Sequence, residues 1–386
     1  MTDVTTPRVR PRSKVANSRA NLREGGFEFL LSVGVTLVAL LIALLFILAN
    51  GVSLSSAVSS FTDGAFGSQI NLAATLATMV PLTLVALGWI VAFRAGRFQV
   101  GFPGQKLVAG LFVSIAALKV SAPVGLHLPL TLFAGMLGGA AWAGIAAWLW
   151  AKRGVNEILS TLLLNLVAVQ LLAWWVRGPF HDPTTPLPVT RPIPSSAMWP
   201  SLLTNTNLHW DIVLLGAVVV IGYMLAKTSF GFQIRLVGAN EEAAQHAGLR
   251  PTRVGTRAMV LSGALGGLAG ASLVIATLVP VMGEDPGSDL GYTGIAVALL
   301  ARNSPWGVIP SALLFASLVQ GSTEMSATIG ISSSLAGFIQ GLMVVLVLGA
   351  TTILYTARKR RQQRRGSGKR APTPLPTPHE VEVVQP

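Results

Sequence analysis

Long apolar stretches alternate with short polar segments along most of this 386-residue chain. A helix that crosses the hydrocarbon core of a bilayer needs about 20 predominantly apolar residues. The pattern predicts ten such spans, at residues 29–49, 71–93, 104–120, 128–150, 158–176, 210–227, 258–279, 289–301, 307–323 and 334–356. The eighth is too short to cross as a regular helix, so we expect a broken or tilted element there. The predicted fold class is all-α, a polytopic helical membrane bundle.

The composition supports this class and narrows the chemistry. Hydrophobic residues make up 52% of the chain and charged residues 11%, against roughly 25% charged residues in soluble domains. Cysteine is absent, which excludes disulfides, thiolate metal sites and cysteine nucleophiles. The net charge of +13 is expected if lysine and arginine gather on the cytoplasmic flanks of the spans.

The distribution of positive charge predicts the topology. If the N-terminus is cytoplasmic and ten spans follow, all but three of the 28 lysines and arginines lie in cytoplasmic segments. The exceptions are Lys119, Arg177 and Arg191. Since cytoplasmic loops are enriched in these residues, we predict that both termini are cytoplasmic.

The polar segments divide the chain into a membrane domain and two tails. Residues 1–28 are basic and predicted to be a disordered cytoplasmic tail. Residues 29–356 form the transmembrane domain, and 357–386 form a basic, proline-rich cytoplasmic tail. We attribute the basic cluster in this second tail to attraction by anionic membrane lipid, and we expect no nucleic-acid partner.

Two loops of the membrane domain are long enough to contact other proteins. The predicted external loop, residues 177–209, is rich in proline and therefore extended and stiff. It is either a plain connector or a docking surface for an extracytoplasmic partner. The predicted cytoplasmic loop, residues 228–257, contains a short helix with Asn240 as its N-cap and Gly248 as its C-terminal stop.

The alanine-rich side of this short helix has two interpretations. The helix is either a solvated loop element or an element that lies in a groove of a partner protein. Small side chains have little bulk of their own with which to build a core, which favours the second interpretation. The residues concerned are Ala239, Ala243, Ala244 and Ala247.

The sequence lacks the motifs of several classes of protein. It has no Walker-type phosphate loop and no H-E-x-x-H motif, and its five histidines are scattered without metal-ligand spacing. Runs of acidic residues in mid-span, typical of ion-coupled carriers, are also missing. We therefore predict no catalytic residue, no metal and no cofactor. A secondary carrier or channel remains an alternative from another class.

Three polar segments interrupt the apolar pattern. Residues 96–105 contain three glycines and a proline, and form either a turn or irregular backbone that lines a cavity. Asn165 lies inside a span, where it either hydrogen bonds to another helix or faces a pathway. Residues 291–307 form either a hairpin or a cavity-lining segment.

Four segments in order resemble one protein family. Residues 154–165, 237–248, 261–270 and 296–307 are similar to the permease subunits of bacterial ABC importers for nucleosides and simple sugars. These belong to the branched-chain amino acid and ribose permease superfamily. The resemblance covers roughly residues 70–350. At residues 96–105 the family usually has Asn and Glu where this chain has Gln99 and Pro103, which leaves the substrate open.

The resemblance implies a function and a set of partners. It implies a multi-pass permease of the bacterial plasma membrane that translocates a nucleoside, with a ribose-like sugar or a branched-chain amino acid as alternatives. ATP hydrolysis is expected on a separate cytoplasmic ABC ATPase. The other expected partners are an extracytoplasmic substrate-binding protein or lipoprotein, a second permease subunit, identical or different, and membrane lipid.

The resemblance also assigns roles to particular residues. The segment that matches the family's coupling helix implies ATPase contact by Gly238, Asn240, Ala243, Ala244 and Gly248. We expect the substrate pathway to include amide side chains and an aromatic face. The candidates for that pathway are Asn165, Gln105, Asn303 and Trp306.

Overall fold

The computed structural model describes residues 53–276, except positions 124, 204, 205 and 207, residues 290–329, and the single positions 41 and 341. Both predicted tails and the predicted spans at 29–49 and 334–356 lie outside the described residues, apart from positions 41 and 341. Within the described part the fold is all-helical and contains no strand. The predicted fold class is confirmed at that level.

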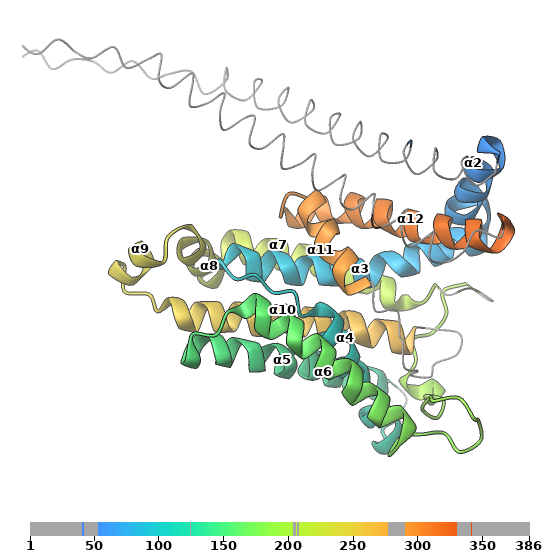
Figure 1. Cartoon of the computed structure of the whole chain (residues 1–386), viewed down its shortest axis with the longest axis horizontal. Helices are drawn as coiled ribbons and strands as arrows, with labels where there is room; N and C mark the ends of the chain where they lie inside the picture. Colours follow the sequence, from blue (N-terminus) through green and yellow to red (C-terminus); the bar gives the residue numbers. More distant parts are fainter. Residues whose placement is uncertain are drawn as a thin grey trace, which may run out of the picture. The chain divides into compact units, whose positions relative to one another are not determined.

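The chain forms its elements in a simple order, shown in Figure 1. They are α2 (Leu54–Thr62), a π-helical turn η1 (Asp63–Gly67), α3 (Gln69–Arg94), α4 (Phe102–Lys119), α5 (His127–Arg153), α6 (Glu157–Arg177), the short 3-10 turns η2 (Ser195–Ala197) and η3 (Trp210–Gly216), α7 (Ala217–Lys227), α8 (Ser229–Ala239), α9 (Glu241–His246), α10 (Pro251–Ile275), α11 (Leu290–Leu300), η4 (Pro305–Gly307) and α12 (Val308–Ile329).

Five helical segments of the described part are long and apolar enough to cross a membrane. They are α3, α5, α6, the continuous η3–α7 segment and α10, and each coincides with a predicted span. The predicted spans 104–120 and 307–323 appear as α4 and α12. The short eighth span appears as α11, with 11 residues. The count of ten spans and the location of the termini stay predictions.

Burial separates central helices from peripheral ones. In α3, every residue from position 79 to position 92 is buried, and α10 packs against α3, α4 and α5. By contrast, α6 and α7 expose large apolar side chains, among them Leu159, Leu163, Leu166, Val219 and Val220. A contiguous exposed apolar surface of this kind marks contact with lipid or another protein. The outer helices therefore provide surfaces suited to lipid or protein contact.

A seam of small residues joins α5 to α10. A Cβ atom on Gly139 would lie 2.6 Å from the backbone nitrogen of Gly267, and one on Gly263 would lie 2.6 Å from the carbonyl oxygen of Gly139. The glycines of the two helices therefore pack directly against each other. Small residues allow such close backbone approach between membrane helices.

The two long loops lie at opposite ends of the helical bundle. Figure 1 shows α9 at one end and the loop between α6 and η3 at the other. Helix α3 runs between these ends (Figure 1), and Arg94 at its C-terminal end lies against Gly238 of α8. The placement of these two loops on opposite sides of a membrane stays a prediction.

Candidate functional site

Helix α9 has the local structure that its sequence predicts. The Oδ1 atom of Asn240 accepts a hydrogen bond of 3.0 Å from the backbone N–H of Ala243, and Glu241 and Glu242 occupy the first turn. Such N-caps and acidic first turns stabilise a helix start. Gly248 has a φ of 81°, a left-handed conformation that glycine adopts readily after a helix. The predicted N-cap and C-terminal stop are therefore confirmed.

The proposed contact residues of this region differ in their exposure. Ala243 and Gly248 are exposed, whereas Ala244 is fully buried against the chain itself. Gly238 allows a close backbone approach, since a Cβ atom there would lie 2.9 Å from the carbonyl carbon of Arg94 and overlap its oxygen. The exposed face of α9 therefore presents Ala243, while Ala244 and Gly238 dock α8 and α9 onto the bundle.

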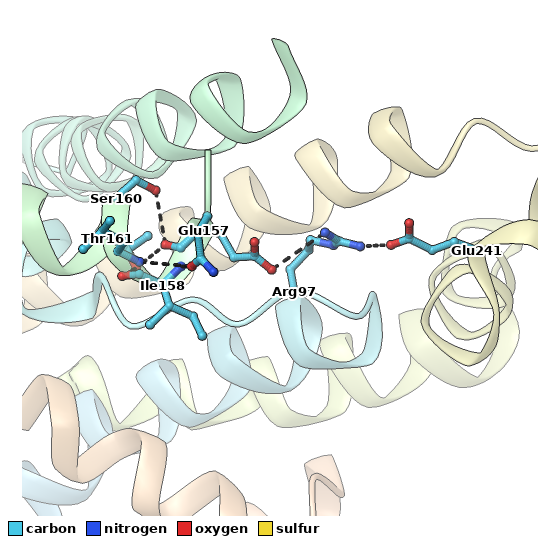
Figure 2. Close-up of polar contacts among 8 residues, drawn as sticks. Arg97, Glu157, Ile158, Ser160, Thr161 and Glu241 are labelled. Atoms are coloured by element: carbon cyan, nitrogen blue, oxygen red, sulfur yellow. Dashed lines mark hydrogen bonds and ion pairs between the residues drawn. The ribbon is translucent and has the colours of Figure 1, made fainter. Parts of the chain in front are cut away.

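Arg97 connects α9 to the rest of the molecule. It lies in the irregular stretch between α3 and α4, and its guanidinium group forms ion pairs with Glu157 (3.7 Å) and with Glu241. Its Cζ atom lies 4.1 Å from the centroid of the Trp150 ring. Figure 2 shows Arg97 between the two carboxylates, one at the start of α6 and the other at the start of α9. We call Arg97, Trp150, Glu157 and Glu241 the arginine cluster.

The electrostatics of the arginine cluster follow from its partial burial. The side chain of Arg97 is 10% exposed, that of Glu157 16% and that of Glu241 45%. Burial lowers the pKa of the Arg97 guanidinium and the Glu157 carboxylate opposes this shift, so the group stays charged at neutral pH. Removing one partner of a buried ion pair leaves an uncompensated charge. The cluster therefore resists separation of α9 from α6.

The irregular stretch before α4 is anchored by α6. The Oδ1 atom of Asn165 accepts a hydrogen bond from the N–H of Gly104 (3.0 Å), and its Nδ2 donates to the carbonyl of Val100 (3.0 Å) and to Tyr292 Oη (3.3 Å). Thr161 Oγ1 accepts from the N–H of Val100 (3.3 Å). Both polar atoms of Asn165 are thus engaged within the chain, and its position is that of an anchor for the start of α4.

The other three pathway candidates lie at the start of α4, after α11 and in η4. Gln105 is buried at the start of α4, next to Gly266 of α10. Asn303 has a φ of 54° after α11, and its carbonyl accepts a hydrogen bond of 2.8 Å from Arg94. Trp306 is 61% exposed and covers Gly222 of α7. Gln105 lies close to Asn165, which hydrogen bonds to the neighbouring Gly104, whereas Asn303 and Trp306 contact other elements, α3 and α7.

Sequence reasoning missed two features. The first is the role of Arg97, whose only sequence signal is a basic residue inside a glycine-rich break. The second is a cavity of about 190 Å³ among α3, η3, α10, α11 and α12, with polar lining from Thr78, Asp211, Ser272 and Gln320. The available sequence signal for this cavity is the presence of single polar residues in otherwise apolar stretches. A criterion based on runs of acidic residues does not detect it.

Comparison with known proteins places the chain in a family. Residues 71–348 match the family described as the branched-chain amino acid transport system permease component. The chain is 34% identical to the glucose ABC transporter permease protein TsgB13 of Haloferax volcanii over 73% of this chain and 77% of that protein.

Two further relatives carry nucleoside names. The guanosine ABC transporter permease protein NupP of Bacillus subtilis is 29% identical over 84% of this chain and 95% of its own length. The nucleoside ABC transporter permease protein NupB of Lactococcus lactis is 34% identical over 68% of this chain and 75% of its own length. With its family match over most of the membrane domain, the chain belongs to the branched-chain amino acid transport system permease family, a family of membrane transport components.

Proposed function

We propose that this chain is the membrane-spanning subunit of an ATP-driven importer of nucleosides. The observation that carries the proposal is the similarity to a guanosine permease along 95% of that protein's length. A second relative with a nucleoside name supports it. The similarly related glucose permease makes a simple sugar the second candidate substrate.

Helix α9 is the proposed contact with a separate cytoplasmic ATPase. It lies at the end of the bundle opposite the 178–209 loop (Figure 1). It exposes small side chains, Ala243 among them, which suit insertion into a groove of a partner. The loop at the opposite end is the proposed docking surface for an extracytoplasmic substrate-binding protein. A second permease subunit and a bacterial plasma membrane complete the proposed assembly.

The arginine cluster connects α9 to the helices of the bundle, so that movement of α9 can be transmitted to α6. Displacement of α9 moves Glu241, and the ion pair passes that displacement to Arg97 and to Glu157 at the start of α6. The same stretch of backbone is hydrogen-bonded to α6 through Asn165. A partner shifts the equilibrium between two conformations only if it binds them with different affinity. In this proposal the ATP-bound ATPase makes that distinction through α9.

Radiolabelled uptake by cells that express the complete transporter tests the proposed substrate. Cells with and without this gene are compared for uridine, guanosine, ribose, glucose and leucine. Loss of nucleoside uptake is the expected result. Loss of sugar or leucine uptake alone would transfer the assignment to that substrate. Uptake that continues after ATP depletion would instead indicate a secondary carrier or channel.

Gly248→Asp tests the ATPase contact, with Gly248→Asn as its control. Among the described residues, no other atom lies within 4 Å of a Cβ placed at this position, and Asp and Asn both tolerate left-handed backbone. We expect both variants to fold, and only the aspartate to place a charge in the contact. ATP-driven uptake should fall at least tenfold for Asp and persist for Asn. Equal uptake by both variants would contradict the assignment.

A further inference from the structure

Residues from five elements line the cavity among α3, η3, α10, α11 and α12. Thr78, Ala77 and Pro81 come from α3, Asp211 from η3, Ser272 from α10 and Gln320 from α12, and α11 closes it with one leucine. Its volume is about 190 Å³, smaller than the roughly 300–1,000 Å³ of pockets for drug-sized ligands. A cavity of this size suits one sugar ring rather than a larger molecule.

Asp211 is the unusual residue of the cavity. Its relative exposure is 1%, and its Oδ2 atom accepts a hydrogen bond of 2.7 Å from Ser272 Oγ. Its other oxygen, Oδ1, is buried and accepts no hydrogen bond of good geometry among the described residues. The backbone N–H groups of Asp211 and Ile212 and the His209 side chain also act on this carboxylate. Leaving a buried carboxylate oxygen without a donor is costly. The site therefore has an open acceptor position that a ligand's donor group would satisfy.

Two more acceptors contribute to the same lining. The amide nitrogen of Gln320 donates to Thr78 Oγ1 (2.6 Å) and faces the carbonyl of Ala74 (3.5 Å). This orientation leaves Oε1 of Gln320 as the remaining acceptor. Pro81 has no N–H, so the carbonyl of Ala77, one turn earlier, lacks its usual helical donor. The polar lining is therefore dominated by acceptors.

A lining of acceptors selects the chemistry of its ligand. Hydroxyl groups can donate to the three acceptors, whereas a carboxylate or phosphate would be repelled by Asp211. We propose that Asp211 and Gln320 bind the hydroxyl groups of a sugar ring, either the ribose of a nucleoside or a free sugar, as the substrate passes through the permease. This inference rests on the proposed function and deepens it.

The position of the cavity fits a substrate that arrives from the loop end of the bundle. Ser272 and Ala276 line the cavity at the end of α10. The N–H of Trp199, in the 178–209 loop, donates to the neighbouring carbonyl of Ile275 (3.3 Å). The arginine cluster lies beyond the other end of α3, because Arg97 follows Arg94, the last residue of that helix. A substrate released onto the loop would thus reach the cavity first.

Asp211→Asn tests the inference in the complete transporter reconstituted into proteoliposomes. The amide keeps the shape and the Ser272 bond but removes the charge that strengthens a hydrogen bond from a ligand. We expect guanosine uptake at limiting concentration to fall at least about tenfold. Uptake of 2′,3′-dideoxyguanosine, which lacks the ring hydroxyls, should be low in the wild type and unchanged by the substitution. Asp63→Asn, the same change at an exposed carboxylate, serves as the control and should match the wild type.

The outcomes separate this inference from the proposed function. If wild-type transporter takes up neither nucleosides nor sugars, the proposed function fails whatever Asp211 does. If wild type takes up a nucleoside or a sugar and an assembled Asp211→Asn variant takes it up equally well, the inference is overturned. If that variant does not assemble, Gln320→Met replaces it, and undiminished guanosine or sugar uptake by Gln320→Met overturns the inference.

Discussion

The two ends of α3 differ in how completely the charged side chains near them are paired within the chain. Beyond its C-terminal end, Arg97 is paired with Glu157 and Glu241 and covered by Trp150. Beside its N-terminal half, Asp211 has one carboxylate oxygen that no donor of the described residues satisfies. The first arrangement satisfies its charges within the chain and holds elements together. The second leaves an acceptor for something that is not part of the chain.

This difference teaches which polar groups belong to the scaffold and which to a ligand. Buried polar groups in proteins are almost always hydrogen-bonded. Asn165 follows that rule through partners that are distant in the sequence. The terminal nitrogens of Arg97 pair with two distant carboxylates, while its Nε has no partner among the described residues. A buried carboxylate that follows it only in part, beside a cavity, points to a binding role. Three substitutions test the comparison between the two ends.

Gly238→Ala should have the largest effect, because it separates α8 and α9 from the end of α3. The new Cβ atom would overlap the carbonyl of Arg94, and the backbone must move. Overpacking of this kind costs about 1–3 kcal/mol, and we expect ATP-driven uptake to fall more than tenfold. Gly144→Ala is the matched control, because its Cβ would meet only Val260 among the described residues, at 3.9 Å.

Two separate measurements, one for each end of α3, make this first test more specific. Guanosine binding by the detergent-solubilised transporter reports on the cavity, and ATPase activity stimulated by the binding protein reports on the coupling end. We expect Gly238→Ala to change the second and preserve the first. Loss of both to the same degree would show that the two ends of α3 do not behave as separate regions.

Arg97→Gln should have an intermediate effect. It removes the charge that pairs Glu157 with Glu241, and Gln cannot reproduce the planar, charged contact with Trp150. Because Glu241 is about half exposed, we expect a loss nearer 1–3 kcal/mol than the 3–5 kcal/mol of a fully buried pair. Uptake per ATP hydrolysed should fall several-fold.

The conservative and control variants define how this result is interpreted. Arg97→Lys should restore part of the coupling, since it keeps the charge but loses the planar group. Arg153→Gln, at an exposed arginine of α5, should couple as the wild type does. Wild-type coupling in Arg97→Gln would show that the arginine cluster is dispensable.

Weakening the hydrogen bonds to the Asp182 carboxylate should have the smallest effect, and that effect should be confined to the 178–209 loop. Thr184 donates to its carboxylate through both its N–H (3.0 Å) and its Oγ1 (2.8 Å), which holds the pKa of Asp182 below its ordinary value. A lowered pKa contributes stability above the ordinary value, about 3.9, and that stability is lost as the pH falls through the lowered pKa. The loop should therefore loosen in acid.

Limited digestion with an acid protease measures that loosening. We expect Thr184→Val to move the onset of cleavage in the 178–209 loop to higher pH, and Thr185→Ala, whose hydroxyl bonds Leu187 instead, to leave it in place. Uptake at neutral pH should be the same for all three proteins. Identical acid profiles for the Thr184 and Thr185 variants would exclude this role for Asp182.

Local features were the part of the structure that the sequence predicted well. The break between α3 and α4, the cap of α9 by Asn240 and the left-handed Gly248 all depend on residues close together in the chain. The spans of the described part were predictable because apolar length reflects the thickness of the bilayer.

Long-range polar contacts were the part that could not be predicted. Nothing in the vicinity of Arg97 in the sequence names Glu157 or Glu241 as its partners. The cavity takes single polar residues from α3, η3, α10 and α12, and no periodic pattern links them. The sequence indicates that Asn165 needs a hydrogen-bonding partner. Whether this partner is a backbone group or a substrate depends on the position of α4.

The contact between α5 and α10 has a consequence for the genetics of this protein. Gly139, Gly263 and Gly267 meet where no Cβ atom fits, and replacement of glycine by any other amino acid introduces one. Random mutagenesis should therefore find almost no tolerated substitution at these codons. A map of viable mutations would trace the line along which the two helices touch.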